Sequence, residues 1–355
     1  MDQEATDERD TSRHTRWSRR RVLTVGLGTA AGIVIAGATG VELVSRGALP
    51  GQQELNQLEG GCSVTRPKFQ FAALGHSVSG SFHSRARRRA VGYTVAWPPG
   101  AAPGTPLPLI VMLHGNGGNH TDALSDLRPD EAVALVVDGH PLPPMAMVTV
   151  DGGGGYWNPH PGDDPMAMVV SELIPLCQGM NLGRAPQRIG TMGISMGGYG
   201  AILLGEKYPQ LIRAVAAISP AIWTTYGEAQ AANPAAYASA ADFSANDAVS
   251  HTAALSNTPV RVASGNDDPF HPGVLALARQ LPKTSTVVLS QGCHTGPFFS
   301  AQEPPSLQFL GRHLAHVPIG PEDHSSRRSQ LSESESERAA THKPSQRVNL
   351  DVTVF

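Results

Sequence analysis

The chain has 355 residues, of which 40% are hydrophobic and 16% are charged, so it is long enough to bury one large core. Its 38 glycines and 29 prolines suit a fold with many loops, and one main domain with appendages is the economical organisation. The formal net charge of -3 is too small to indicate nucleic acid or another polyanion as a partner.

The N-terminal segment, residues 1–45, is predicted to be an export signal. Arg19 and Arg20 stand before the charge-free run 22–41, and Ala36-Gly37-Ala38 offers a small-residue cleavage site, a pattern that resembles a twin-arginine signal. The first alternative is an uncleaved membrane anchor through residues 22–41, because about 20 uncharged residues can just span a bilayer. Both place the rest of the chain outside the cytoplasm. A buried apolar helix is the remaining alternative.

Residues 46–66 form a linker-like lead, and the main domain is predicted over residues 67–317. Apolar, β-branched segments punctuated by Pro and Gly predict strands at 91–97, 107–113, 145–150, 188–192, 213–218, 259–263 and 286–289. Helical spacing of apolar residues is found at 165–176, 198–208 and 306–317. Strands that alternate with helices predict an α/β fold, with a mostly parallel central sheet flanked by helices.

Two further segments are interpreted from their composition. Arg85, Arg87, Arg88 and Arg89 form a cluster that we interpret as the solvated tip of a hairpin. Residues 318–355 are rich in Ser, Glu, Arg and Pro, which predicts a disordered tail.

Two glycine-rich segments follow predicted strands. The segment 113–118 can present the backbone N–H of Asn116 to a developing oxyanion, while His114 is expected to hold this loop through ring hydrogen bonds. The segment 151–155 contains four consecutive glycines, which allow the backbone to approach a ligand closely. Tyr156 and Trp157 follow it, either as substrate-contacting aromatic residues or as core residues. No Gly-Lys-Ser/Thr follows, so nucleotide binding is not predicted.

Gly193-Ile194-Ser195-Met196-Gly197 is the most informative motif of the chain. It matches G-x-S-x-G, follows a short apolar run and precedes small residues, which is the context of a strand, a sharp turn and a helix. Such a turn lifts Ser195 out of the sheet as a nucleophile and leaves the N–H of Met196 as a second oxyanion donor. Without that context the pentapeptide is a weak signal in a chain rich in Gly and Ala.

A nucleophilic serine needs a histidine base and a carboxylate, which in this type of enzyme follow in the order Ser, Asp, His. The turn 265–270 offers Asp267 and Asp268, and the turn 292–296 offers His294. Both turns follow strands, at the edge of a parallel sheet where ligand sites gather. We assign Asp268 as the acid that orients His294 and keep Asp267 as the alternative, because one of the two is expected to cap the next helix.

The three cysteines, Cys62, Cys177 and Cys293, allow at most one internal disulfide. A bridge from Cys62 to Cys293 would tie the lead to the histidine turn, and three unpaired buried thiols are the alternative. No pair has the spacing of a zinc site, so no metal is predicted.

Together these motifs resemble the putative-esterase branch of the α/β-hydrolases, which includes esterase D (S-formylglutathione hydrolase), feruloyl and acetylxylan esterases, and mycolyltransferases. The matching segments are 113–115, 151–157, 193–201, 265–270 and 292–294. The resemblance implies a single catalytic domain with the α/β-hydrolase fold and a serine-dependent carboxylic-ester hydrolase that needs no metal or organic cofactor. Cys293 beside the histidine and Phe299, where a tryptophan is frequent, depart from the family pattern.

The expected activity is hydrolysis of a small-molecule, glycolipid or polysaccharide ester outside the cytoplasm, through an acyl-enzyme on Ser195. One alternative is an acyltransferase of the mycolyltransferase type, in which a sugar or lipid hydroxyl replaces water. Another is a non-catalytic binding protein on the same fold. The complete set of Ser195, Asp268 and His294 favours an enzyme over a binding protein.

Overall fold

The computed structural model describes residues 61–315. The predicted signal, most of the predicted lead and the predicted tail lie outside the described residues. Between residues 61 and 315, no helix has the length and apolar character needed to cross a membrane.

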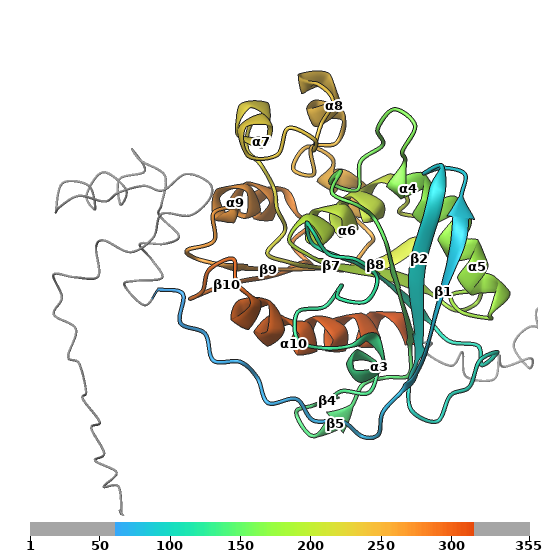
Figure 1. Cartoon of the computed structure of the whole chain (residues 1–355). Coiled ribbons are helices and arrows are strands. Elements are labelled where there is room, and N and C mark those ends of the chain that lie inside the picture. Colours follow the sequence, from blue (N-terminus) through green and yellow to red (C-terminus); the bar gives the residue numbers. More distant parts are fainter. Residues whose placement is uncertain (1–60, 316–355) are drawn as a thin grey trace, which may run out of the picture.

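A sheet of eight strands forms the middle layer of the molecule (Figure 1), in the order β1-β2-β6-β3-β7-β8-β9-β10. β2 pairs antiparallel with β1 and β6, and all the other neighbours are parallel. The strands are β1 (His76–Ser84), β2 (Arg89–Trp97), β3 (Leu109–Leu113), β6 (Ala146–Val150), β7 (Ile189–Ile194), β8 (Ile212–Ile218), β9 (Val260–Gly265) and β10 (Thr286–Ser290). The predicted α/β fold with a mostly parallel sheet is confirmed.

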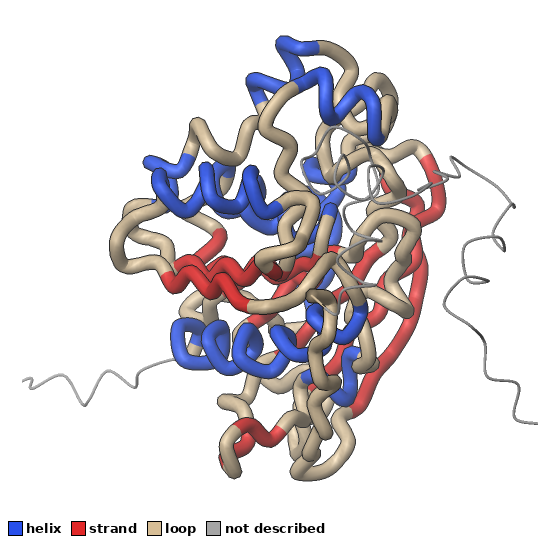
Figure 2. The backbone as a smooth tube through the Cα atoms, turned by 90° about the vertical axis from the view of Figure 1, so that its left-hand side faces the viewer, coloured by secondary structure: helices blue, strands red, loops and turns tan. Residues whose placement is uncertain are grey.

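Helices cover both faces of the sheet (Figure 1), and Figure 2 shows the twist of the sheet between them. One face packs against α6 (Met196–Lys207), α9 (His271–Gln280) and the continuous run of α4 (Pro165–Met168), a π-helical turn (Val169–Leu173) and α5 (Ile174–Gly179). The opposite face packs against α3 (Pro129–Ala132) and α10 (Gly296–Leu314). Each helical layer thus closes its own apolar core against the sheet.

Among the elements that differ from the prediction, β1 and α10 do so for identifiable physical reasons. β1 was not predicted, because most of its side chains are exposed and no apolar face marks it in the sequence. α10 begins ten residues before the predicted start at residue 306 and continues through Pro304 and Pro305. Prolines usually end a helix, so the sequence before them does not look helical.

A small cap, defined as residues 226–247, lies between β8 and β9 along the chain and above α6 and α9 (Figure 1). It contains α7 (Tyr226–Ala232), which buries only Ala229, and α8 (Ala240–Ala245), which buries no residue. Ala236 and Tyr237, between the two helices, belong to the apolar core, and hydrogen bonds also attach the cap to the domain. The Tyr199 hydroxyl on α6 donates to Asn246 O at 2.6 Å, and Asn158 Nδ2 donates to Ala236 O at 3.2 Å.

The arginine cluster does lie at the tip of the β1–β2 hairpin, but Arg87 is only 4% exposed and is not solvated as predicted. Its Nε and Nη2 donate to the two carboxylate oxygens of Asp163 at 2.7 and 3.0 Å, and its Nη1 donates to Asp151 O at 2.6 Å. The buried guanidinium therefore joins the hairpin to the loop that follows β6.

A small β-ribbon, β4 (Val136–Val137) and β5 (His140–Pro141), lies beside α3 and outside the main sheet. A short 3-10 turn, Thr252–Leu255, precedes β9.

Glu206 on α6 is 6% exposed, and neither of its carboxylate oxygens has a hydrogen-bond partner among the described residues. Burial raises the pKa of Glu206 from 4.5 to about 9. At pH values between 4.5 and about 9, Glu206 is protonated in the folded state and ionised in the unfolded state. The free energy of unfolding therefore falls as the pH rises, by up to about 1.4 kcal/mol per pH unit.

We expect Glu206→Gln to flatten this slope and to raise the free energy of unfolding at pH 8. Urea denaturation at several pH values measures both effects. A variant with an unchanged slope would contradict the assignment of the buried proton to Glu206.

Candidate active site

Ser195 lies on the turn between β7 and α6, with φ 57° and ψ -121°. A positive φ at a residue other than glycine costs free energy and persists only where neighbours hold the backbone. Here Ser195 N donates to Ile218 O at 2.9 Å, and Ser195 O accepts from Ala221 N at 3.0 Å. A side chain at Gly193 would collide with the Gly197 backbone, and one at Gly197 would collide with the Leu113 carbonyl. The turn therefore needs both glycines.

The structure brings Ser195, His294 and Asp268 into one hydrogen-bonded chain. His294 Nε2 lies 2.8 Å from Ser195 Oγ, and His294 Nδ1 lies 2.9 Å from Asp268 Oδ2. Asp268 is 3% exposed, and its Oδ1 accepts from Phe270 N at 2.9 Å. Because the carboxylate accepts the Nδ1 proton, Nε2 is left to accept a proton from the serine hydroxyl. It is Asp268, and not the alternative Asp267, that contacts His294 in this way.

Three strands position these side chains. Ser195, Asp268 and His294 follow the C-terminal ends of the parallel strands β7, β9 and β10, as the sequence predicts. Asp267 N donates to Gly292 O at 3.0 Å, so the turns that carry the acid and the histidine contact each other directly. Phe270 and Phe299 hold the imidazole edge-on, with ring centroids 5.1 and 4.9 Å away.

The two predicted oxyanion donors lie beside the serine. The loop after β3 packs against the nucleophile turn at Gly115, whose added Cβ would lie 3.6 Å from Ser195 Cβ. Asn116 borders the same cavity as Ser195, and Met196 is the first residue of α6. Within residues 61–315, neither backbone N–H is bound to another backbone carbonyl. Both are therefore available to a bound oxyanion.

His114 is fully buried and uses both ring nitrogens to hold the loop, as expected from the sequence. Nε2 accepts from Gly152 N at 2.8 Å, which leaves the proton on Nδ1 to be donated to Gly115 O at 2.7 Å. Burial lowers the pKa of His114, which keeps the ring neutral. The imidazole thus clamps the loop after β3 to the loop after β6.

Tyr156 and Trp157 are buried core residues, which corrects the prediction that they contact substrate. Trp157 is 1% exposed, its ring packs against Gly152 and Gly200, and its Nε1 donates to His114 O at 3.3 Å. Tyr156 is 4% exposed and lies among other aromatic rings. The glycines before them let the chain fold back, so both rings enter the core.

An active-site cavity of about 520 Å³ opens beside the serine. Its lining residues are Gly115, Asn116, Gly117, Gly118, Asp122, Ala123, Leu124, Ser125, Ile194, Ser195, His294 and Phe299. Asp122 is the only carboxylate among them, and none is Lys or Arg. The wall at 122–125 was missed by sequence reasoning, because no motif marks it. Glu303 on α10 positions this wall by accepting a hydrogen bond from Ser125 N.

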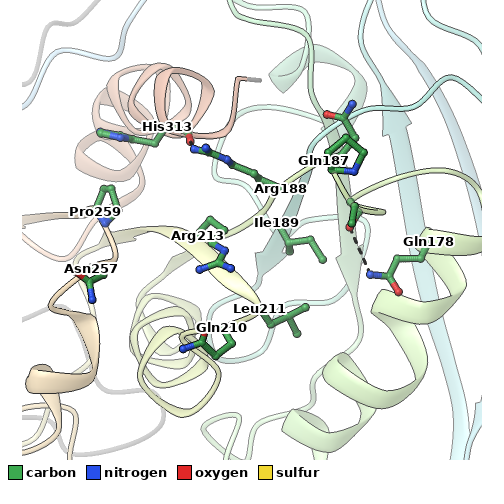
Figure 3. A pocket seen from close by; sticks show the side chains of 13 residues that line it. Gln178, Gln187, Arg188, Ile189, Gln210, Leu211, Arg213, Asn257, Pro259 and His313 are labelled. Atoms are coloured by element: carbon green, nitrogen blue, oxygen red, sulfur yellow. Dashed lines mark hydrogen bonds between the residues drawn. The ribbon is translucent and has the colours of Figure 1, made fainter. Parts of the chain in front are cut away.

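A larger cavity, of about 630 Å³, lies at the opposite edge of the sheet, near the starts of β7, β8 and β9 (Figure 3). Arg188, Arg213 and His313 are among its lining residues, and Arg188 Nη1 donates to His313 O at 3.0 Å. Since Ser195 follows the other end of β7, this cavity takes no part in chemistry at the serine. In the part of the chain that the structure describes, no group of three or more His, Cys, Asp or Glu side chains could hold a metal ion.

The strand order, the turn after β7 and the chain of three side chains define an α/β-hydrolase. The chain belongs to the putative esterase family, whose model matches residues 84–291, more than half of the sequence. It is therefore a carboxylic-ester hydrolase, and Ser195 in its turn is consistent with a serine esterase.

Solved structures agree in fold. A ferulic acid esterase has a TM-score of 0.55 and 19% identity, covering 69% of this chain and 100% of its own. S-Formylglutathione hydrolase from Agrobacterium tumefaciens has a TM-score of 0.54 and 18% identity, covering 71% and 100%. The fluorophosphonate-binding serine hydrolase F of Staphylococcus aureus has a TM-score of 0.51 and 14% identity, covering 67% and 99%. No curated protein matches the sequence.

Proposed function

We propose that this protein is an exported serine esterase that cleaves carboxylic esters through an acyl-enzyme on Ser195. The observation that carries the proposal is the unbroken contact from Ser195 Oγ through both nitrogens of His294 to the buried carboxylate of Asp268. Such a chain activates a serine hydroxyl as a nucleophile, because the imidazole accepts its proton while the carboxylate stabilises the imidazolium that forms.

The reaction proceeds in two halves. Ser195 Oγ attacks the ester carbonyl and His294 Nε2 takes its proton, while the N–H groups of Asn116 and Met196 stabilise the oxyanion. His294 then gives the proton to the leaving alcohol, and the acyl group stays on Ser195. Water, deprotonated by the same imidazole, attacks the acyl-enzyme and releases the acid.

Neutral esters suit the active-site cavity best. Leu124 and Phe299 offer apolar surface to an acyl or aromatic group, and Asp122 repels an anionic substrate. The absence of Lys and Arg from the described lining leaves a carboxylate or phosphate on the substrate without a counter-charge. A neutral small-molecule, glycolipid or polysaccharide ester is therefore the proposed substrate class.

Trapping the intermediate tests the mechanism. A p-nitrophenyl ester mixed with the enzyme and quenched within the first turnover should add the mass of one acyl group to the peptide that contains Ser195. Hydrolysis without an adduct at that serine under rapid quenching, or an adduct at another residue, would contradict the proposal.

Export is supported by the paired arginines before residues 22–41 and by the disulfide between Cys62 and Cys293, a bond that persists in oxidising compartments. Replacing Arg19 and Arg20 together by Lys is expected to retain the protein inside the cell. Fractionation and immunoblotting measure this, and undiminished export would reject the twin-arginine interpretation.

A further inference from the structure

The described chain begins with a strap, defined as residues 61–71, that is covalently tied to the active site. Cys62 forms a disulfide with Cys293 across 231 residues of sequence, with the two Cα atoms 4.9 Å apart. Cys293 directly precedes His294 in the sequence. From this point the strap runs past α10 towards α3 and β4 (Figure 1).

The strap is held at its other end by the body of the domain. Val136 N in β4 donates to Gln70 O at 2.8 Å, and Phe71 forms an isolated β-bridge with Leu135. Between the two ends, Arg66 forms an ion pair with Asp126, just beyond the cavity wall at 122–125. Arg66 is half-exposed, so this ion pair alone contributes little. The disulfide is the strong attachment near the site.

Besides the disulfide, the histidine turn is held by non-covalent contacts, which include the hydrogen bonds of His294 with Asp268 and Ser195. Thr295 N donates to Cys293 O at 2.9 Å, which is a contact within the turn itself, and Asp267 N holds Gly292 O from the acid turn. Gly292 has a φ of 144°, a conformation that only glycine adopts readily, and a side chain there would collide with Phe298 of α10. Cys293 is fully buried, and Val64 of the strap packs beside Gly292.

We propose that the Cys62–Cys293 disulfide positions His294. Esterase activity therefore depends on whether these two cysteines are oxidised to the disulfide. The inference rests on the proposed function of Ser195, since a positioned base matters only if that serine reacts. A displacement of about 1 Å in a catalytic group can cost about 100-fold in rate. The disulfide, which restrains Cys293 next to His294, is thus expected to affect the catalytic rate as well as the stability of the protein.

The chemistry of the switch is thiol–disulfide exchange. In a reducing cytoplasm Cys62 and Cys293 are two thiols. Outside it, they lose two protons and two electrons to one disulfide of an oxidoreductase or of a small molecule, which becomes two thiols. In the reverse direction a thiolate attacks Cys62 Sγ, the less buried of the two, and Cys293 leaves as a thiolate; a second thiolate then releases Cys62 from the mixed disulfide. The esterase would then reach full activity only after export.

The test uses the intact, oxidised full-length protein. Dithiothreitol should lower kcat for a p-nitrophenyl ester about tenfold, leave KM unchanged and slow the pre-steady-state burst. Oxidised glutathione should restore the activity. Cys62→Ser should show the same low kcat without any response to dithiothreitol. Cys177→Ala is the matched control, because Cys177 is buried and burial raises its pKa to about 12. It should keep wild-type activity and the wild-type response.

The outcomes separate positioning from simple stabilisation. If the reduced enzyme keeps its kcat and only its thermal midpoint falls, the bond is structural and the inference is overturned. Near-UV circular dichroism of the reduced wild type establishes that the protein is folded during the assay, so the test stands even if Cys62→Ser does not fold. Turnover that persists in Ser195→Ala would reject the proposed function instead, independently of the response to dithiothreitol.

Discussion

Ser195→Ala is expected to lower kcat for a p-nitrophenyl ester at least about 10⁴-fold, with little change in KM. The hydroxyl is the atom that bonds to the acyl group, and no other hydroxyl lies within reach of His294 Nε2 among the described contacts. The oxyanion donors and the cavity remain, so binding and a small residual rate enhancement remain as well.

Steady-state kinetics over a range of ester concentrations measure this loss. Ser285→Ala is the matched control, because its buried hydroxyl lies in the turn before β10 and makes no hydrogen bond among the described residues. The double variant Ser195→Ala with His294→Ala should be hardly slower than either single variant, since the two residues act as a unit. Near-normal turnover in Ser195→Ala would place the nucleophile elsewhere.

Asp268→Asn is expected to lower kcat by about 10⁴-fold while the fold is retained. The carboxylate accepts the proton of His294 Nδ1, and an amide in its place can instead donate to that nitrogen. The imidazole then carries its proton on Nε2, where it can no longer accept one from Ser195. The variant therefore loses activity because His294 has the wrong tautomer, while the volume of the side chain at position 268 is unchanged.

Asp267→Asn is the neighbouring control, because it makes the same chemical change one residue away, at a side chain that is partly exposed. We expect its kcat to stay close to that of the wild type, because His294 Nδ1 donates to Asp268. Parallel measurement of kcat and of the thermal midpoint ranks the two variants. A larger loss in Asp267→Asn would reverse the assignment of the acid.

Local signals were sufficient to predict much of the site. The turns that contain Ser195, Asp268 and His294 each follow a buried apolar strand, and parallel strands bring their C-terminal ends to one edge. The glycines at 193 and 197 mark the sharp turn directly, because no side chain fits at either position. The order of the motifs along the chain, the pattern of strands and the composition of the turns were therefore enough to predict these three positions.

Features that depend on distant contacts could not be predicted in the same way. The wall at 122–125 is held by Glu303, which lies 178 residues from Ser125 in sequence. Composition alone does not predict whether the side chains of Trp157 and Arg87 face the solvent or the core. Both are buried and form hydrogen bonds with residues far along the chain. The sequence allowed the Cys62–Cys293 pair as one of two alternatives, and only the packing of the strap beside β10 brings the two together.

The cap combines two exposed helices with a short buried segment, and this division decides which of its residues can be exchanged. α7 buries only Ala229 and α8 buries no residue, so the exposed positions of both helices can change without opening a cavity beneath them. Ala236 and Tyr237, between the two helices, are 0% and 4% exposed and belong to the apolar core, where the Tyr237 ring contacts the ring of Tyr199. The cap can therefore accept new sequence at its exposed helical positions, whereas truncation of Tyr237 would leave a cavity in the core over α6.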